Sequence, residues 1–179
     1  GREGKVYLTT NGTYFCESEK NYIKENIYYT ITYVYNKGTH CIYVNNNLVS
    51  SYTGIAPLNN KGDRMIGSYK GIAYQFSGIM DEVRFFNKSL SKEEINKYIK
   101  IQLKGNEDGL VGLWNFNNII EDKVSNIVRP ENICTMYNCE MSDDTFLKNS
   151  YKYFIKSKSN LYSIKPEYYD NIINMYKKN

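Results

Sequence analysis

Two neighbouring carboxylates and an arginine lie inside an apolar run of the sequence, FSGIMDEVRFF (76–86). Asp81 and Glu82 are residue types that act as acid and base in glycoside hydrolysis, or that bind metal ions. Glycosidase carboxylates must approach one bond from the same side, at about 5–10 Å from each other. Consecutive residues of a strand point to opposite faces, so this pair is not predicted to be catalytic. We interpret Asp81 as an inward-facing structural residue that needs hydrogen bonds, and Arg84 as a partner for Glu82 on the opposite face.

The rest of the sequence offers no stronger catalytic candidate. His40 is the only histidine, and its position beside a predicted hairpin turn favours a surface residue over a catalytic base. The sequence contains no G-x-S-x-G, P-loop, H-E-x-x-H or EF-hand spacing. No converging set of catalytic groups can be assigned, so the sequence predicts a protein that is not an enzyme.

The four cysteines, Cys16, Cys41, Cys134 and Cys139, favour disulfides over a metal site. A structural zinc site needs tighter pairs or additional histidines. Two disulfides leave three connectivities open, of which we favour Cys134–Cys139 as a local clamp and Cys16–Cys41 across strands.

Two glycosylation sequons begin at Asn11 and Asn87. Together with the even cysteine count they favour a secreted or cell-surface protein. No run of about 18 apolar residues is present, so no membrane span is predicted.

The composition argues against a nucleic-acid partner, and it also reflects the base composition of the coding genome. The net charge is +4, and the lysines are interleaved with acids, whereas a nucleic-acid binder concentrates its positive charge on one face. The usage is rich in Lys, Asn, Tyr and Ile and poor in Ala and Arg. It is typical of an AT-rich genome, so the 19 tyrosines are weak evidence for function.

Strand and turn signals fill the first half of the chain. Three β-prone runs at 27–36, 41–44 and 48–52 are separated by short Asn- and Gly-containing links, which predicts an antiparallel meander. Another short strand is expected in RMIGSY (64–69). The alternation in 79–86 predicts one strand, with Ile79, Asp81, Val83 and Phe85 on one face.

A short helix is predicted directly after that strand. Ser91 and Glu94 have the spacing of a capping box, and Leu90 and Ile95 that of a hydrophobic staple. A further strand is expected at 108–118, with Trp114 in the core. Beyond it, 143–157 and 166–178 are expected to be helical.

The order of these segments resembles concanavalin A-like jelly-roll modules of the laminin-G type. The residues that carry the resemblance are the strand ending in YVNNN, the RMIGS segment and FSGIMDEVRFFNKSLSKEEI. The resemblance covers about 6–101 and implies an antiparallel β-sandwich with a helical C-terminal extension. We divide the chain into a laminin-G-like portion at 1–118 and an extension at 119–179.

The resemblance also implies partners and one metal. Several strands that open such a module are missing before Gly1, and GLVGLWNFNN (109–118) resembles an opening strand. The chain is therefore a fragment of a larger protein, a module with permuted strand order, or one module followed by a second that begins at Asp108. We favour the fragment, and expect another polypeptide, or a larger complex, to supply the missing strands. Modules of this type often bind calcium through loop oxygens; Asn59, Asn60 and Asp63 are the local candidates, although a plain turn explains them as well. No other cofactor is expected.

Two functions remain open at this stage. The first is a non-catalytic recognition module of a larger secreted or cell-surface protein, which binds a glycan or a protein receptor. The second is an accessory jelly-roll domain that holds together other domains or chains of an adhesin, toxin or enzyme. Fold alone does not choose between them.

Overall fold

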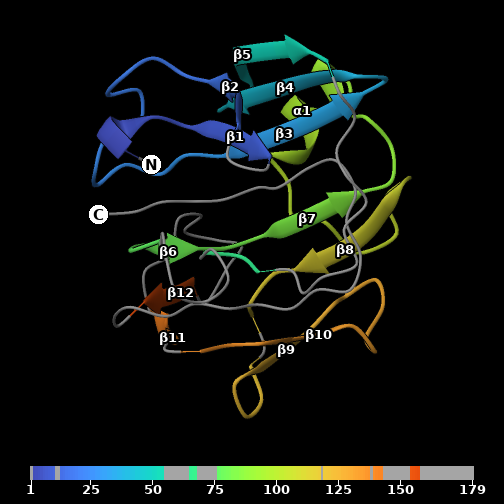
Figure 1. The fold of residues 1–179 in the computed structure, drawn as a ribbon. Helices are drawn as coiled ribbons and strands as arrows, with labels where there is room; N and C mark the ends of the chain where they lie inside the picture. The colour runs from blue at the N-terminus through green and yellow to red at the C-terminus, as the bar shows by residue number, and fades with distance from the viewer. Residues whose placement is uncertain are drawn as a thin grey trace.

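The structure, a computed structural model, describes residues 2–10, 13–54, 65–67, 76–117, 119–137, 139–142 and 154–157. A 3-10 turn, η1 (Arg2–Gly4), leads into a hairpin of β1 (Tyr7–Thr10) and β2 (Thr13–Glu17). In Figure 1 this hairpin lies at the N-terminal end of the molecule, beside the largest meander.

The predicted meander is present as β3 (Ile31–Asn36), β4 (Thr39–Val44) and β5 (Asn47–Thr53), paired antiparallel in that order. Its two turns contain consecutive residues with positive φ, Lys37–Gly38 and Asn45–Asn46. Such turns match the right-handed twist of the flanking strands, and Asn and Gly adopt their backbone angles at low cost. Local turn chemistry therefore sets the register of these strands.

The segment 79–86 differs from the single strand that was predicted. It forms β6 (Ile79–Met80) and β7 (Val83–Phe86), separated by Asp81 and Glu82. Glu82 has a φ of 52°, which ends the regular alternation of faces. All eight residues are buried, because both faces of this segment are covered. The capped helix α1 (Lys92–Tyr98) follows, and β8 (Leu110–Trp114) pairs antiparallel with β7.

The remaining described elements are strands. β9 (Lys123–Ser125) pairs with β10 (Ile133–Thr135), while β11 (Cys139–Ser142) pairs with β12 (Phe154–Ser157), and β12 also pairs with β6. The prediction of a helix over 143–157 was therefore wrong at 154–157, where cross-strand pairing with β6 and β11 replaces it. The helix predicted at 166–178 lies outside the described residues. Within RMIGSY, residues 65–67 are described and form a bend instead of a strand.

Two hydrophobic clusters form the core. One packs Trp114 against residues of β7, β9 and β10; its buried members are Ile66, Met80, Val83, Phe85, Trp114, Phe116, Val124, Cys134 and Met136. The other joins β3, β7 and β8 to α1; its buried members are Val34, Phe86, Leu90, Ile95, Tyr98, Leu103, Leu110 and Leu113. The prediction that Trp114 is a core residue is confirmed. The domain boundary at 118/119 stays a prediction, and residues on both sides of it pack in the first cluster.

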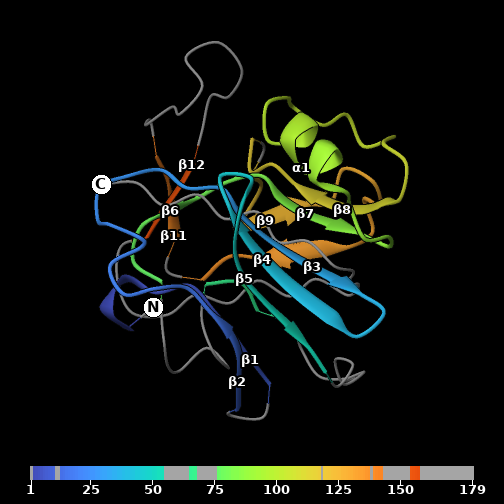
Figure 2. The same cartoon turned by 90° about the horizontal axis from the view of Figure 1, so that it is seen from above.

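The arrangement is layered. Figure 1 shows β3–β5 with the hairpin β1–β2 at the top, β6–β8 below them, and β9–β12 at the bottom. Figure 2, seen from above, shows α1 next to β7 and β8, where the second cluster lies. The described residues confirm the mainly β, antiparallel fold class, with one short helix.

Candidate binding cleft

A cleft of about 980 Å³ lies where the N-terminal hairpin meets the start of β3 and the segment before β6. Its described lining combines half-buried apolar residues with charged and amide side chains. The lining residues are Glu3, Gly4, Lys5, Val6, Tyr7, Asn21, Ile23, Lys24, Glu25, Ile31 and Phe76. Small-molecule sites in proteins are clefts of about 300–1,000 Å³. The volume of this cleft lies in that range, and its described lining is about equally apolar and polar.

Backbone hydrogen bonds hold one wall of the cleft. The Ser18 amide donates to the Val6 carbonyl at 2.8 Å, and the Ile23 amide donates to the Gly4 carbonyl at 2.7 Å. Gly4 has a φ of +66°, and a Cβ placed on it would lie 2.5 Å from the Ile23 carbonyl oxygen. Only glycine therefore allows the chain at 2–6 to approach 18–23 this closely.

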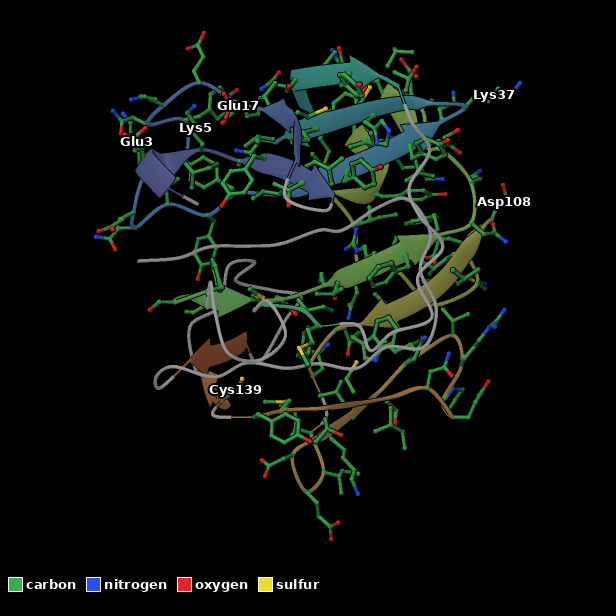
Figure 3. The ribbon with its side chains drawn as sticks, in the orientation of Figure 1. Glu3, Lys5, Glu17, Lys37, Asp108 and Cys139 are labelled. Atoms are coloured by element: carbon green, nitrogen blue, oxygen red, sulfur yellow. The ribbon has the colours of Figure 1, made fainter. Side chains whose placement is uncertain are left out.

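The charges around the cleft are partly paired. Lys5 forms an ion pair with Glu17 at 3.1 Å, and Glu3 forms one with Lys20 at 3.0 Å. Figure 3 shows Glu3, Lys5 and Glu17 close together at this end of the molecule. The described lining contains two lysines and two glutamates, so its formal charges cancel.

The predicted Asp81–Glu82–Arg84 group is buried in the core, away from the lining of the cleft. Arg84 Nη2 and Nε donate to Glu82 Oε2 at 2.7 and 3.1 Å, and each of these side chains is almost fully buried. The predicted pairing of Glu82 with Arg84 is present, inside the protein instead of on an exposed face. Asp81 Oδ1 accepts a hydrogen bond from the Glu82 amide at 2.8 Å.

Burial dominates the ionisation of these acids. Burial, and after it the neighbouring Glu82 carboxylate, raises the pKa of Asp81 to about 9. Burial also raises the pKa of Glu82, although the Arg84 guanidinium acts in the opposite direction. At neutral pH Asp81 is therefore protonated, and Glu82 Oε1 has no hydrogen-bond partner within the described residues.

Arg84 also fixes the end of helix α1. Its guanidinium donates to the carbonyl oxygen of Tyr98, an orphan acceptor at the helix C-terminus, and to that of Ile101 in the segment that follows. At the other end of α1, the predicted capping box is present: the Glu94 amide donates to Ser91 Oγ at 3.2 Å, and the Ser91 amide donates to Glu94 Oε2 at 2.9 Å. The buried pair thus connects strand and helix, and neither residue belongs to the described lining of the cleft.

The prediction that His40 is a surface residue was wrong. Its side chain is only 2% exposed. Tyr35 pairs with His40 across β3 and β4, and the Nδ1 atom of His40 lies 2.8 Å from Tyr33 Oη. The aromatic residues that the meander register brings onto this face bury the imidazole.

Neither favoured disulfide is formed, and all four cysteines are free thiols. Cys16 Sγ donates to the His40 carbonyl at 3.6 Å and hydrogen-bonds with Ser50. Because Cys41 follows His40 in β4, its side chain points to the opposite face, where it packs on the cluster around α1.

In the other favoured pair, Cys134 is buried in the Trp114 cluster, while Cys139 donates its thiol to the Tyr137 carbonyl at 3.2 Å. Burial raises the pKa of Cys139 to about 11, so this thiol is protonated at neutral pH and a poor nucleophile.

The remaining predicted sites are resolved only in part. Asn87 is exposed in the turn that follows β7, whereas Asn11 and the calcium candidates Asn59, Asn60 and Asp63 lie outside the described residues. Across the described ranges, no cluster of three or more metal-binding side chains occurs. In the same ranges, no helix has the length and apolar character to cross a membrane.

Sequence reasoning did not identify the cleft residues. Lys24, Glu25 and Asn21 lie in a polar stretch that carries no motif, and Phe76 is more than 40 residues away from them in the chain. Gly4 was the only local signal, because a glycine between charged residues can mark a close backbone approach.

A comparison with protein-family models matches residues 2–96 to a model described as the concanavalin A-like lectin/glucanases superfamily. The matched range includes every described residue that lines the cleft. Searches of curated proteins and of solved structures found no match.

Proposed function

Because the chain belongs to the concanavalin A-like lectin/glucanase superfamily, we propose that it is a non-catalytic recognition module of a larger secreted or cell-surface protein. Its ligand is a glycan or a protein partner, and the binding site is the cleft. The observation that carries this proposal is the combination of half-buried apolar and charged residues around a cleft of about 980 Å³. The buried acids support a non-catalytic role, because Asp81 and Glu82 are shielded from any substrate.

Binding to an array of glycans and candidate receptor ectodomains tests the proposal. We expect the intact protein to bind at least one ligand, and Phe76→Ala to weaken that binding about tenfold, because an aromatic side chain in the cleft is truncated. Leu48→Ala, which truncates an exposed side chain of β5, is the matched control and leaves binding unchanged. Equal binding by the wild type and Phe76→Ala would move the site away from the cleft.

A second candidate function is an accessory domain that holds other chains. Exposed apolar residues in and next to the β9–β10 hairpin favour it: Ile120 is 73%, Ile133 is 45% and Tyr137 is 48% exposed. In this case another polypeptide covers these exposed apolar residues, or pairs with edge strands of the sheets. The mass of the native protein tests it: co-purification of a second polypeptide, lost in Ile120→Lys, supports the accessory role, whereas a monomer that melts cooperatively contradicts it.

A further inference from the structure

We infer that residues 2–6, which we call the strap, open and close one wall of the cleft while the hydrophobic core stays folded. The strap supplies Glu3, Gly4, Lys5 and Val6 to the described lining. Entry of a ligand past the open strap rests on the proposed recognition function, whereas the opening itself does not. Three features of the strap carry the inference: its attachment through backbone hydrogen bonds, its strain, and its position outside the core.

The strap is attached to the segment 18–23 mainly through its backbone. Three amides of that segment donate to carbonyl oxygens of the strap, at 2.7 or 2.8 Å. The pairs are Ser18 with Val6, Asn21 with Glu3, and Ile23 with Gly4. The side chains of Glu3 and Lys20 form an ion pair but are both more than half exposed, so this pair adds little. The strap therefore leaves the segment 18–23 when a few neighbouring hydrogen bonds break together.

The closed strap is strained at Glu3. This residue has a φ of 57° and a ψ of 32°, a left-handed conformation that costs free energy in most residues other than glycine. Such conformations persist only where the surrounding contacts impose them, and they cluster at ligand clamps and switch regions. Opening of the strap lets Glu3 return to an ordinary backbone conformation, so the strain lowers the free energy of opening.

The strap also lies outside the described hydrophobic core. Residues 3–6 are half-buried or exposed, and the buried members of both clusters come from other segments. Figure 3 shows Glu3 and Lys5 at one end of the molecule. Segments with few buried apolar contacts open at a free energy far below that of global unfolding. Because the pairing of β1 with β2 begins at Tyr7, we place the hinge of the strap there.

Native-state amide hydrogen exchange of the intact chain, with no ligand added, tests the opening. The amides of Ser18, Asn21 and Ile23 report on the strap, and the buried Leu113 amide, which donates to Asn126 Oδ1 at 3.1 Å, reports on global unfolding. We expect the three strap reporters to share one protection factor, at least about 100-fold smaller than that of Leu113. Low urea should speed exchange at Leu113 and leave the strap reporters almost unchanged, because opening of the strap exposes little surface.

Gly4→Ala gives a second readout. The added Cβ would lie 2.5 Å from the Ile23 carbonyl oxygen, so we expect the strap reporters to exchange about tenfold or more faster. Gly38→Ala is the matched control, at a glycine with a φ of +89° in the turn between β3 and β4. It destabilises the closed and open forms alike, so it should speed exchange at Leu113 and leave the strap reporters unchanged.

Strap reporters that exchange as slowly as Leu113, or that follow Leu113 in urea and in Gly38→Ala, would show that the strap opens only when the whole chain unfolds. Either result would overturn the inference. The wild-type comparison decides the question even where Gly4→Ala does not fold. Because the experiment uses no ligand, its outcome leaves the recognition function to be decided by its own binding test.

Discussion

At the scale of single residues, the buried Arg84 has the largest structural role that a side chain shows in the described protein. It neutralises Glu82 and also binds two carbonyl oxygens beyond β7. A buried charge that loses its partner is costly, because the remaining ion is neither hydrated nor paired.

We therefore expect Arg84→Met to lower the free energy of unfolding by about 3–5 kcal/mol. In the double variant Glu82→Gln/Arg84→Met the loss is smaller than the sum of the single losses, since no uncompensated charge remains. Urea denaturation of the four proteins measures the cycle. Lys88→Met, which removes a more exposed ion-pairing cation, is the control and should change stability much less. Additive losses would show that Glu82 and Arg84 do not interact.

Asp81 makes stability depend on pH. An unperturbed aspartate has a pKa of about 3.9, and burial raises the pKa of folded Asp81 to about 9. The folded state thus holds a proton that the unfolded state releases, so this contribution is fully present below the unfolded pKa and is lost as the pH rises through about 9. Glu82, whose pKa is also raised by burial, acts in the same direction.

We expect Asp81→Asn to fold, because its amide oxygen can still accept the Glu82 amide proton, and to flatten the decline of stability between about pH 5 and 9. Chemical denaturation across that range measures the slope. Asp108→Asn, a substitution at an exposed carboxylate, is the control. We expect its stability to depend on pH with the wild-type slope. An unchanged slope in Asp81→Asn would contradict a protonated Asp81.

At the scale of elements, the turns of the meander and the cap of α1 follow from local sequence. Ser91 and Glu94 close the capping box, and Lys88 bridges Glu94 at 2.7 Å and Asp108 at 2.6 Å. The strand–turn–helix unit is therefore held by contacts between residues close in the chain, as well as by the buried Arg84.

Ser91→Ala removes the oxygen that accepts the Glu94 amide proton, and we expect it to lower the free energy of unfolding by about 1 kcal/mol. Ser91→Asp restores a cap and should recover most of that loss. Thermal or urea unfolding monitored by circular dichroism measures both variants, with Ser125→Ala at an exposed strand position as control. A loss in Ser91→Ala no larger than in Ser125→Ala would contradict a stabilising cap.

The contrast between predicted and observed elements has a physical basis. The meander, the helix cap and the core position of Trp114 depend on turn residues and periodicity, which are local and could be read from the sequence. The division of 79–86 into β6 and β7 could not, because Glu82 adopts a positive φ that the surrounding buried contacts impose. The strand at 154–157 depends on its pairing with β6, which is about 75 residues away in the chain.

At the scale of the whole molecule, the two hydrophobic clusters share β7 and β8, so loss of one cluster should disturb the other. Trp114 is fully buried in the first cluster and its ring meets Phe85 edge-on at 5.8 Å. As the only tryptophan, it reports on that cluster alone. The second cluster contains α1, which contributes to the circular dichroism signal.

We expect the Trp114 fluorescence and the far-ultraviolet circular dichroism of the chain to change at the same urea concentration, because the clusters unfold together. Val34→Ala, in the second cluster, should shift both transitions equally. Two separate midpoints would show that the clusters unfold independently and would favour a boundary within the chain.

The cleft could not be predicted from the sequence, because segments that are far apart in the chain form it. Its residues become neighbours through backbone hydrogen bonds between 4 and 23 and between 6 and 18, and through packing that brings Tyr7 of β1 and Ile31 of β3 to the same cleft. The sequence could indicate the family, whereas the location of the cleft required the three-dimensional arrangement.

The two carbonyl contacts of Arg84 also affect how α1 opens. An isolated helix of seven residues frays from its ends within microseconds, and its amide protons would exchange with solvent almost freely. In this protein the C-terminal end of α1 cannot unwind without breaking the hydrogen bond from the buried Arg84 guanidinium to the Tyr98 carbonyl. We therefore expect deuterium uptake at Ile99, whose amide donates to Ile95, and proteolysis around 98–101 to be slower than in a freely fraying helix.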